Sequence, residues 1–145
     1  MKNKIENLIK ELEDISNNYL LELSDGRFQI SFQMTETDKL SVVITDNGRD
    51  IDIYSLSAGE TARVNVAVLL AIRKLMQGLS NSRINLLFLD ETMATLDDDG
   101  KERLIQLLLV EENLNTILVT HSYTHPLLEK ISVSKTNNIS KIIRT

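Results

Sequence analysis

The sequence predicts an α/β fold: an N-terminal helix, then an antiparallel β meander, then strand–helix–strand units that form a parallel sheet. Residues 20–54 alternate apolar and polar side chains, which is typical of strands with one buried face. Residues 58–77 change to a helical period of apolar side chains. Two short apolar runs, 84–89 and 116–120, then flank a second helical stretch, which is the order of parallel strands joined by a crossover helix.

The composition is that of one compact domain without a membrane span. Of the 145 residues, 42% are hydrophobic and 26% are charged. No apolar run reaches the roughly 18 residues of a spanning helix, and no secretory signal is visible. The absence of cysteine excludes disulfides and cysteine-ligated metals. The net charge of −5 means that any DNA contact comes from a local patch or from a partner.

Residues 1–19 are expected to form a helix with a narrow apolar seam. The seam repeats at alternating steps of three and four residues and consists of Ile5, Leu8, Leu12, Ile15 and Tyr19. This is the spacing of a coiled coil. An ordinary amphipathic helix packed on the domain explains the same spacing, so both interpretations stay open.

Turn residues divide residues 20–54 into strands. Asp25-Gly26 is expected to form a turn, and Asn47-Gly48 is a strong signal for a type I′ hairpin turn. The apolar positions that alternate with polar ones are Phe28, Ile30, Phe32, Leu40, Val42, Ile44, Ile51 and Ile53. One face of this meander should therefore be buried.

Helices and buried strands alternate in the second half of the chain. The helix over 58–77 is expected to end at Gly78, and a second helix is expected over 98–111. The runs 84–89 and 116–120 predict strands that are covered on both faces. The apolar stripe of the first helix consists of Val64, Ala67, Val68, Ala71, Ile72 and Leu75.

The C-terminal residues predict one more helical turn and a hairpin. Pro126 stands where a first turn begins, with Thr124 as its cap. Residues 131–133 and 139–143 are expected to pair around Asn137-Asn138.

The start of the helix over 58–77 is a candidate phosphate-binding site, with the sequence Leu56-Ser57-Ala58-Gly59-Glu60. If Ser57 caps the helix, the N–H groups and positive dipole end of its first turn face outward, a geometry that binds phosphate oxygens. Gly59 lets the backbone approach closely. A capping box between Ser57 and Glu60 explains the same residues without a ligand.

Two adjacent carboxylates follow the first apolar run. Asp90 and Glu91 come at the carboxyl end of an expected parallel strand, which is the ligand-binding edge of an open α/β sheet. Asp90 can hold Mg²⁺ there through water, and Glu91 can orient and polarise an attacking water. The alternative is an acidic pair that starts a loop.

Two further polar elements come after the acidic pair. Ala94-Thr95-Leu96-Asp97 follows it directly, and Asp97 or Asp98 alternatively caps the next helix. His121 follows the second apolar run, where it is either a strand-end residue bonded to the backbone or, beside the acidic strand, a ligand of a terminal phosphate. His125 has no comparable context and is interpreted as a surface residue.

In order and spacing, these elements resemble the ABC-type ATPases. Residues 56–60 resemble the ABC signature, 86–91 the Walker B motif, 94–97 the D-loop, and His121 the switch histidine. With the N-terminal helix and the meander, the chain resembles the C-terminal lobe of an SMC-superfamily head, closest to the Rad-fifty/SbcC DNA-repair ATPases, which include phage recombination-endonuclease subunits. The departures from the usual motifs are Ala58, Thr92 and Thr95.

The resemblance implies site residues and domain boundaries. Residues 1–19 would be the stub of a returning coiled-coil arm, and 20–145 the ATPase lobe. Asp90 would hold Mg²⁺, and Glu91 and His121 would be catalytic. The residues that would bind ATP are Ser57, Ala58, Gly59, Glu60 and Asp97.

No phosphate-binding Gly-x-x-x-x-Gly-Lys-Ser/Thr loop occurs in the chain, because Gly100-Lys101 is followed by Glu102. The lobe alone is therefore expected to be inactive, and to be a truncated piece or a naturally split subunit. The resemblance implies four partners: an N-terminal lobe with Walker A, a second head in an ATP-dependent homodimer, an SbcD-type metal-dependent nuclease, and DNA. It implies no membrane, and a place on DNA in the cytoplasm of a bacterial or phage-infected cell.

Other functions stay open from sequence. A non-catalytic lobe that binds a nuclease or DNA would explain the missing phosphate loop. A chromosome-structuring SMC protein or a RecN- or RecF-like ATPase would share the same motifs. A transporter nucleotide-binding domain fits less well, since transporters place a helical subdomain where this chain has a heptad helix and a meander.

Overall fold

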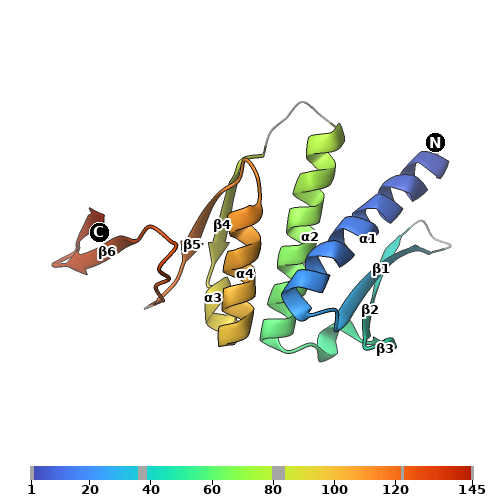
Figure 1. Cartoon of the computed structure of the whole chain (residues 1–145), viewed down its shortest axis with the longest axis horizontal. Helices are drawn as coiled ribbons and strands as arrows, with labels where there is room; N and C mark the ends of the chain where they lie inside the picture. The colour runs from blue at the N-terminus through green and yellow to red at the C-terminus, as the bar shows by residue number, and fades with distance from the viewer. Residues whose placement is uncertain (1, 36–38, 80–83, 122, 145) are drawn as a thin grey trace.

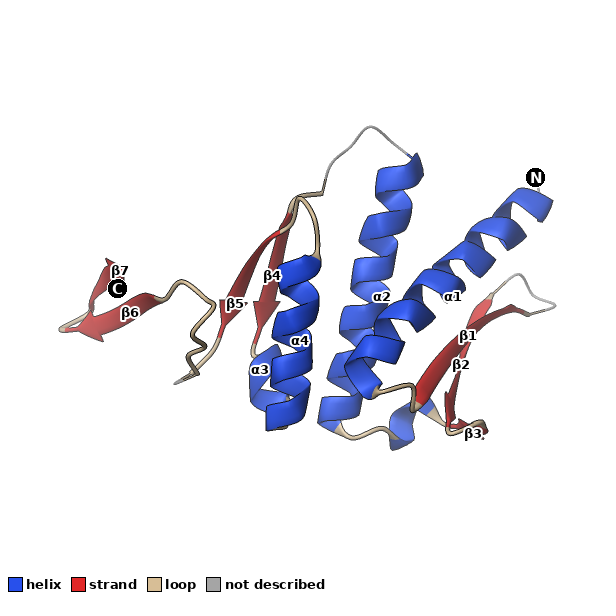
Figure 2. Cartoon of the chain, viewed as in Figure 1, coloured by secondary structure: helices blue, strands red, loops and turns tan. Residues whose placement is uncertain are grey.

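The chain forms helices and three separate small sheets (Figure 1). The computed structural model describes residues 2–35, 39–79, 84–121 and 123–144. The helices are α1 (Lys2–Ser24), the 3₁₀ turn η1 (Ile53–Ser55), α2 (Ala58–Leu79), α3 (Thr92–Thr95) and α4 (Asp98–Val110). The strands are β1 (Phe28–Met34), β2 (Leu40–Asp46), β3 (Arg49–Ile51), β4 (Leu86–Asp90), β5 (Asn115–Val119), β6 (Ile131–Thr136) and β7 (Ile139–Arg144). The predicted α/β class is confirmed: β1-β2-β3 are antiparallel, and β4-β5 are parallel (Figure 2).

Helix α1 is longer than its apolar seam predicts. It continues to Ser24, so the assignment of residues 20–24 to the β region is wrong. Leu20 and Leu23 are fully buried and extend the apolar face by one more turn. Toward the other end, Ile5 is 46% exposed. Packing on the domain therefore accounts for the C-terminal part of the seam, and a coiled coil stays a prediction for the N-terminal part.

The meander forms as predicted because its turns are encoded locally. Asp25 and Gly26 take positive φ values of 55° and 73° and end α1 before the first strand. Asn47 and Gly48, with φ of 48° and 80°, form the hairpin turn between β2 and β3. The alternation of apolar and polar residues in the meander buries Phe28, Ile30 and Ile44 against the helices. Leu40, Val42 and Ile53 are exposed, so the predicted buried face is wrong at these three positions.

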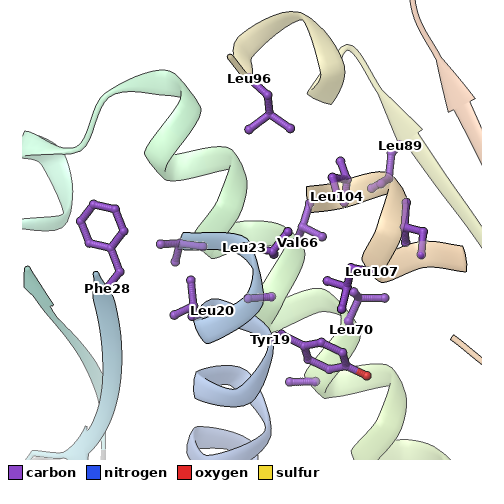
Figure 3. Packing of buried hydrophobic residues seen from close by; sticks show 14 of the residues in the cluster. Tyr19, Leu20, Leu23, Phe28, Val66, Leu70, Leu89, Leu96, Leu104 and Leu107 are labelled. Carbon is purple, nitrogen blue, oxygen red and sulfur yellow. The ribbon is translucent and has the colours of Figure 1, made fainter. Parts of the chain in front are cut away.

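Helix α2 is central to the core. It packs against α1, and Figure 3 shows its apolar side chains meeting those of α1, α4 and β4. The helix continues through Gly78 to Leu79, so Gly78 does not end it. One glycine costs a helix only about 1 kcal/mol, which packing elsewhere along the helix easily offsets. Among the described residues, no helix combines the length and apolar composition that crossing a bilayer requires.

A buried ion pair ties α1, α2 and the end of α4 together. Arg73 on α2 is 5% exposed, and its Nη1 donates to Glu111 Oε2 at 2.9 Å. Its Nε donates to the Ile84 carbonyl at 2.9 Å, and its Nη2 to the Glu112 carbonyl at 3.0 Å. The Tyr19 hydroxyl of α1 donates to Glu111 Oε1 at 2.7 Å, and burial raises the pKa of this phenol well above its ordinary value.

Replacing Arg73 by methionine should lower the free energy of unfolding by about 3–5 kcal/mol. Methionine fills the space but leaves the Glu111 carboxylate buried without its cation. Urea denaturation of the protein measures the change. Arg49→Met, at an exposed position on β3, is the matched control and should stay within about 0.5 kcal/mol. Equal effects of the two substitutions would show that the pair of Arg73 and Glu111 contributes no more to the free energy of unfolding than an exposed arginine does.

The parallel pair β4-β5 is covered on one face only, so the prediction of two covered faces is wrong for this chain. Leu87 and Leu89 point into the core and are buried. On the opposite face, Phe88 is 58% exposed, Ile117 is 44% exposed and Val119 is 45% exposed. An apolar run predicts that both faces of a strand are buried, but it does not show whether the burying residues belong to the same chain or to another one.

The C-terminal region contains a predicted hairpin but not the predicted helix. Strands β6 and β7 pair around Asn137 and Asn138, whose φ values of 50° and 62° suit a type I′ turn. Around Pro126 the chain makes only a single turn, in which the Leu128 N–H donates to the His125 carbonyl at 3.1 Å. The hairpin projects from the body of the molecule (Figure 1), and its apolar side chains are exposed.

Candidate functional site

The first turn of α2 is held by a capping box. Ser57 Oγ accepts a hydrogen bond from the Glu60 N–H at 3.3 Å, and Glu60 Oε2 accepts one from the Ser57 N–H at 2.8 Å. These hydrogen bonds, with a smaller contribution from Arg27, hold the pKa of the Glu60 carboxyl below its ordinary value. The capping-box interpretation is confirmed, and it leaves the Ser57 hydroxyl proton available to donate, since a hydroxyl accepts and donates at once.

The first turn of α2 also has backbone N–H groups that are free to bind a ligand. Ser57 and Ala58 are exposed at the surface. Within the described ranges, no hydrogen bond reaches the N–H groups of Ala58 or Gly59. A helix start with free amides and the positive end of the helix dipole is able to bind an anion.

Gly59 has a structural role that the sequence did not indicate. A Cβ atom at this position would lie 2.7 Å from the Thr95 carbonyl oxygen at the end of α3. The glycine therefore permits close contact between α2 and the loop after the acidic pair, in addition to any approach by a ligand.

The acidic pair lies at the carboxyl edge of the parallel sheet. Asp90 ends β4 and pairs in register with Val119 of β5. Glu91 follows with φ of 55°, a left-handed conformation that is uncommon for a residue other than glycine and is enriched at functional sites. Its N–H donates to the Val119 carbonyl at 3.2 Å, while its side chain makes no capping bond to α3. Both carboxylates are exposed.

His121 emerges at this same edge. It follows Val119 by two residues, and Val119 is the register partner of Asp90. The predicted parallel pairing of the two strands is confirmed, and the carboxyl ends of β4 and β5 lie at the same edge (Figure 2). That the imidazole of His121 meets the two carboxylates there stays a prediction.

A cleft of about 440 Å³ joins the acidic pair to the start of α2. Asp90 and Glu91 border it on the side of β4, and Ala58 borders it on the side of α2. Its other lining residues are Leu56, Thr61, Ala62, Asn65, Val66, Leu69, Leu89, Thr92 and Thr95. The start of α2, whose free N–H groups can bind an anion, and the carboxylates of Asp90 and Glu91 therefore line the same cleft.

Asp97 is the N-cap of α4, which confirms the alternative prediction that it caps the helix after the acidic pair. Its Oδ1 accepts hydrogen bonds from the Gly100 N–H at 2.9 Å and from Arg63 Nη2 at 2.6 Å. The side chain is still 69% exposed, and both of these hydrogen bonds use Oδ1. The sequence did not indicate Arg63, because no local pattern distinguishes an arginine on α2 that reaches the next loop from one that is solvated.

Asp90 suits Mg²⁺ only together with a nucleotide. Among the described residues, no cluster of three or more histidine or acidic side chains could hold a metal ion. Mg²⁺ usually keeps several waters and takes one or two carboxylates plus phosphate oxygens. A single exposed carboxylate at the carboxyl end of a parallel strand fits that mode of binding.

His125 is less exposed than the sequence indicated. Its side chain is 12% exposed, and its Nε2 lies 3.1 Å from Glu102 Oε2 on α4. The Leu127 N–H donates to its Nδ1 at 3.2 Å. His125 thus lies at the surface but is partly buried there, and it fastens the segment after β5 to α4.

Residues 21–109 match the family model described as "SbcC/RAD50-like, Walker B motif". A relative from Escherichia phage T5, "Probable exonuclease subunit 2", is 44% identical over 132 residues, which cover 91% of this chain and 21% of the relative. The "DNA double-strand break repair Rad50 ATPase" of Pyrococcus abyssi is 26% identical over 120 residues, covering 80% of this chain and 13% of that protein. A solved structure from work on "ATP-driven dimerization and DNA stimulated activation of SMC ATPases" superposes with a TM-score of 0.78 at 19% identity, covering 100% of this chain and 89% of that chain.

The fold is thus that of the solved structure from the work on SMC ATPases. The chain belongs to the SbcC/RAD50-like family that carries the Walker B motif. The chain spans about a fifth of the phage relative and about an eighth of the archaeal one.

Proposed function

We propose that this chain is the C-terminal lobe of a DNA repair and recombination ATPase that hydrolyses ATP between two heads and controls a nuclease partner. The observation that supports it most is the parallel pairing of β4 with β5, which places Asp90 and Glu91 at the sheet edge, across a cleft from the start of α2. In this proposal residues 1–19 form the base of a coiled-coil arm, and residues 20–145 form the lobe.

Each site residue then has a role in one of two nucleotide sites. On its own head, Asp90 would hold Mg²⁺ through water, Glu91 would polarise the attacking water, and His121 would bond the γ-phosphate. Bound Mg²⁺ would neutralise charge on the phosphates. Toward the opposite head, the Ser57 hydroxyl and the N–H groups of Ala58 and Gly59, ordered by the Glu60 box, would receive the γ-phosphate.

Asp97 would meet the opposite head through Oδ2. Arg63 and the Gly100 N–H both bind Oδ1, which orients the carboxylate and leaves Oδ2 for a partner. ATP would then favour closed heads and hydrolysis would release them, a shift between two populations.

The exposed apolar face of the β4-β5 sheet supports the proposal that an N-terminal lobe packs against it. A parallel sheet normally has both faces covered, and here one face of two strands and a whole hairpin are open. The exposed apolar side chains on these strands are Leu86, Phe88, Ile117, Val119, Ile131, Val133, Ile139, Ile142 and Ile143. A surface of this kind marks an interface. The phosphate loop that this chain lacks would come with the lobe that covers it.

DNA and a nuclease are proposed as partners from the names of the relatives, which include an exonuclease subunit and a double-strand-break repair ATPase. With a net charge of −5, this chain is expected to reach DNA through a local patch or through its partners. We place the nuclease, of the SbcD type, at the base of the arm near residues 1–19, and the whole assembly on DNA in the cytoplasm of a bacterial or phage-infected cell.

Co-expression of this chain with the N-terminal lobe of its own ATPase tests the proposal. We expect the two to co-purify and to hydrolyse ATP with Mg²⁺, and neither lobe alone to do so. Phe88→Lys, which places a charge on the bare face, should abolish co-purification, whereas Arg49→Met, at an exposed position on β3 in another sheet, should not weaken it. Co-purification without any ATP turnover would favour the non-catalytic lobe instead.

A further inference from the structure

Arg27 connects the β meander to the start of α2 through two carboxylates. Its Nε donates to Asp46 Oδ1 at 2.9 Å and its Nη2 to Asp46 Oδ2 at 2.7 Å. Its remaining nitrogen, Nη1, lies 2.9 Å from Glu60 Oε1. Two parallel hydrogen bonds fix the plane of a guanidinium. With that plane fixed by Asp46 at the end of β2, Nη1 points at Glu60.

Glu60 uses its two oxygens for two different partners. Oε1 binds Arg27, and Oε2 accepts the hydrogen bond from the Ser57 N–H. The Glu60 side chain is 19% exposed, so it lies partly within the protein between these groups. Arg27 therefore orients the carboxylate that orients Ser57, and the Ser57 hydroxyl is oriented in turn by its bond to the Glu60 N–H.

The same contact also compensates a charge. A carboxylate beside the first turn of a helix opposes a second anion at that place, because both compete for the positive end of the dipole. The guanidinium of Arg27 offsets the charge of Glu60 at a distance of 2.9 Å. It also stacks 4.5 Å above the centroid of the Phe28 ring, which keeps it beside the helix although its side chain is 46% exposed.

We propose that Arg27 is a positioning residue that holds the box of Ser57 and Glu60 in the geometry that receives the γ-phosphate from the opposite head. This inference rests on the proposed function. In it, the meander holds Arg27 in position through Asp46 at the end of β2. Arg27 acts through Glu60 and Ser57 and does not itself take part in the chemistry.

The test uses the complete ATPase head, this chain with its N-terminal lobe, carrying Glu91→Gln so that ATP-bound dimers accumulate. Light scattering at a series of protein concentrations gives the apparent Kd of the ATP-dependent dimer, and a fluorescent ATP analogue gives binding to a single head. Arg27→Gln should weaken the dimer about tenfold, the size expected for losing one charge-assisted hydrogen bond. Binding of the analogue to a single head should not change.

Asp46→Asn is the matched control. It removes the charge pair within the meander, but the amide oxygen still accepts one hydrogen bond from Arg27, and the Phe28 ring still holds the guanidinium beside Glu60. Both substitutions should lower Tm, and Asp46→Asn should weaken the dimer less than about threefold. Arg27→Lys, which keeps a cation within reach of Glu60, should restore most of the dimer affinity.

Glu60→Gln provides a second, independent variant that leaves the pair of Arg27 and Asp46 intact. It should also weaken the dimer about tenfold, and the double variant with Arg27→Gln should be no weaker than either single one. Equal weakening by Arg27→Gln and Asp46→Asn would overturn the inference, as would a Glu60→Gln dimer as tight as the parent. A parent head that does not dimerise with ATP would overturn the proposed function as well, and it would do so before any variant is made.

Discussion

Replacing Glu91 by glutamine in the complete ATPase should lower turnover by about 10²–10⁴-fold while ATP-dependent dimers persist. The amide keeps the size of the side chain but cannot take a proton from the attacking water. The carboxylate is exposed and makes no capping bond to α3, so the exchange should cost little stability. Single-turnover hydrolysis measures the chemical step, and size-exclusion chromatography with ATP measures the dimer.

Glu112→Gln is the control for this experiment. Glu112 is also exposed, but it lies in the turn before β5, at the opposite end of the strands from the acidic pair. The Glu112→Gln protein should hydrolyse ATP at the same rate as the unmodified protein. If Glu91→Gln retained full turnover too, Glu91 would not be the residue that activates water.

Replacing Ser57 by arginine should abolish ATP-dependent dimers and leave ATP binding to each single head intact. The substitution puts a long cation at the exposed start of α2, where the opposite head must approach and where the helix dipole already disfavours positive charge. In the proposed function the nucleotide of the same head would contact the sheet edge rather than α2, so its affinity should be unchanged. Light scattering with ATP and binding of a fluorescent ATP analogue separate the two effects.

Ser57→Ala separates the loss of the cap from the added bulk. Both substitutions lose the hydrogen bond from the Glu60 N–H, and each should therefore lower the free energy of unfolding by about 1 kcal/mol. Only Ser57→Arg should abolish the dimer completely. A Ser57→Arg protein that still dimerises with ATP would place the head–head contact elsewhere.

The features that the sequence predicted correctly are set by neighbours along the chain. Asn47-Gly48 adopts positive φ because these residues tolerate it, and the hairpin follows. Ser57 and Glu60 form a capping box because they are three residues apart at a helix start. The errors have the opposite character. Residues 20–24 are helical where Leu20 and Leu23 are buried in the core, and one face of the β4-β5 pair is bare, so both errors concern what a segment packs against.

By itself the sequence determined the order of the signature, Walker B, D-loop and histidine elements, together with the turns and the capping box that neighbouring residues set. Only the tertiary structure decided that β4 and β5 are neighbours, with Asp90 in register with Val119, two residues before His121. It also decided that Arg27 reaches Glu60 and Arg63 reaches Asp97. These contacts join residues 33 and 34 positions apart, and since no local period or propensity records such a separation, the path of the folded chain must bring them together.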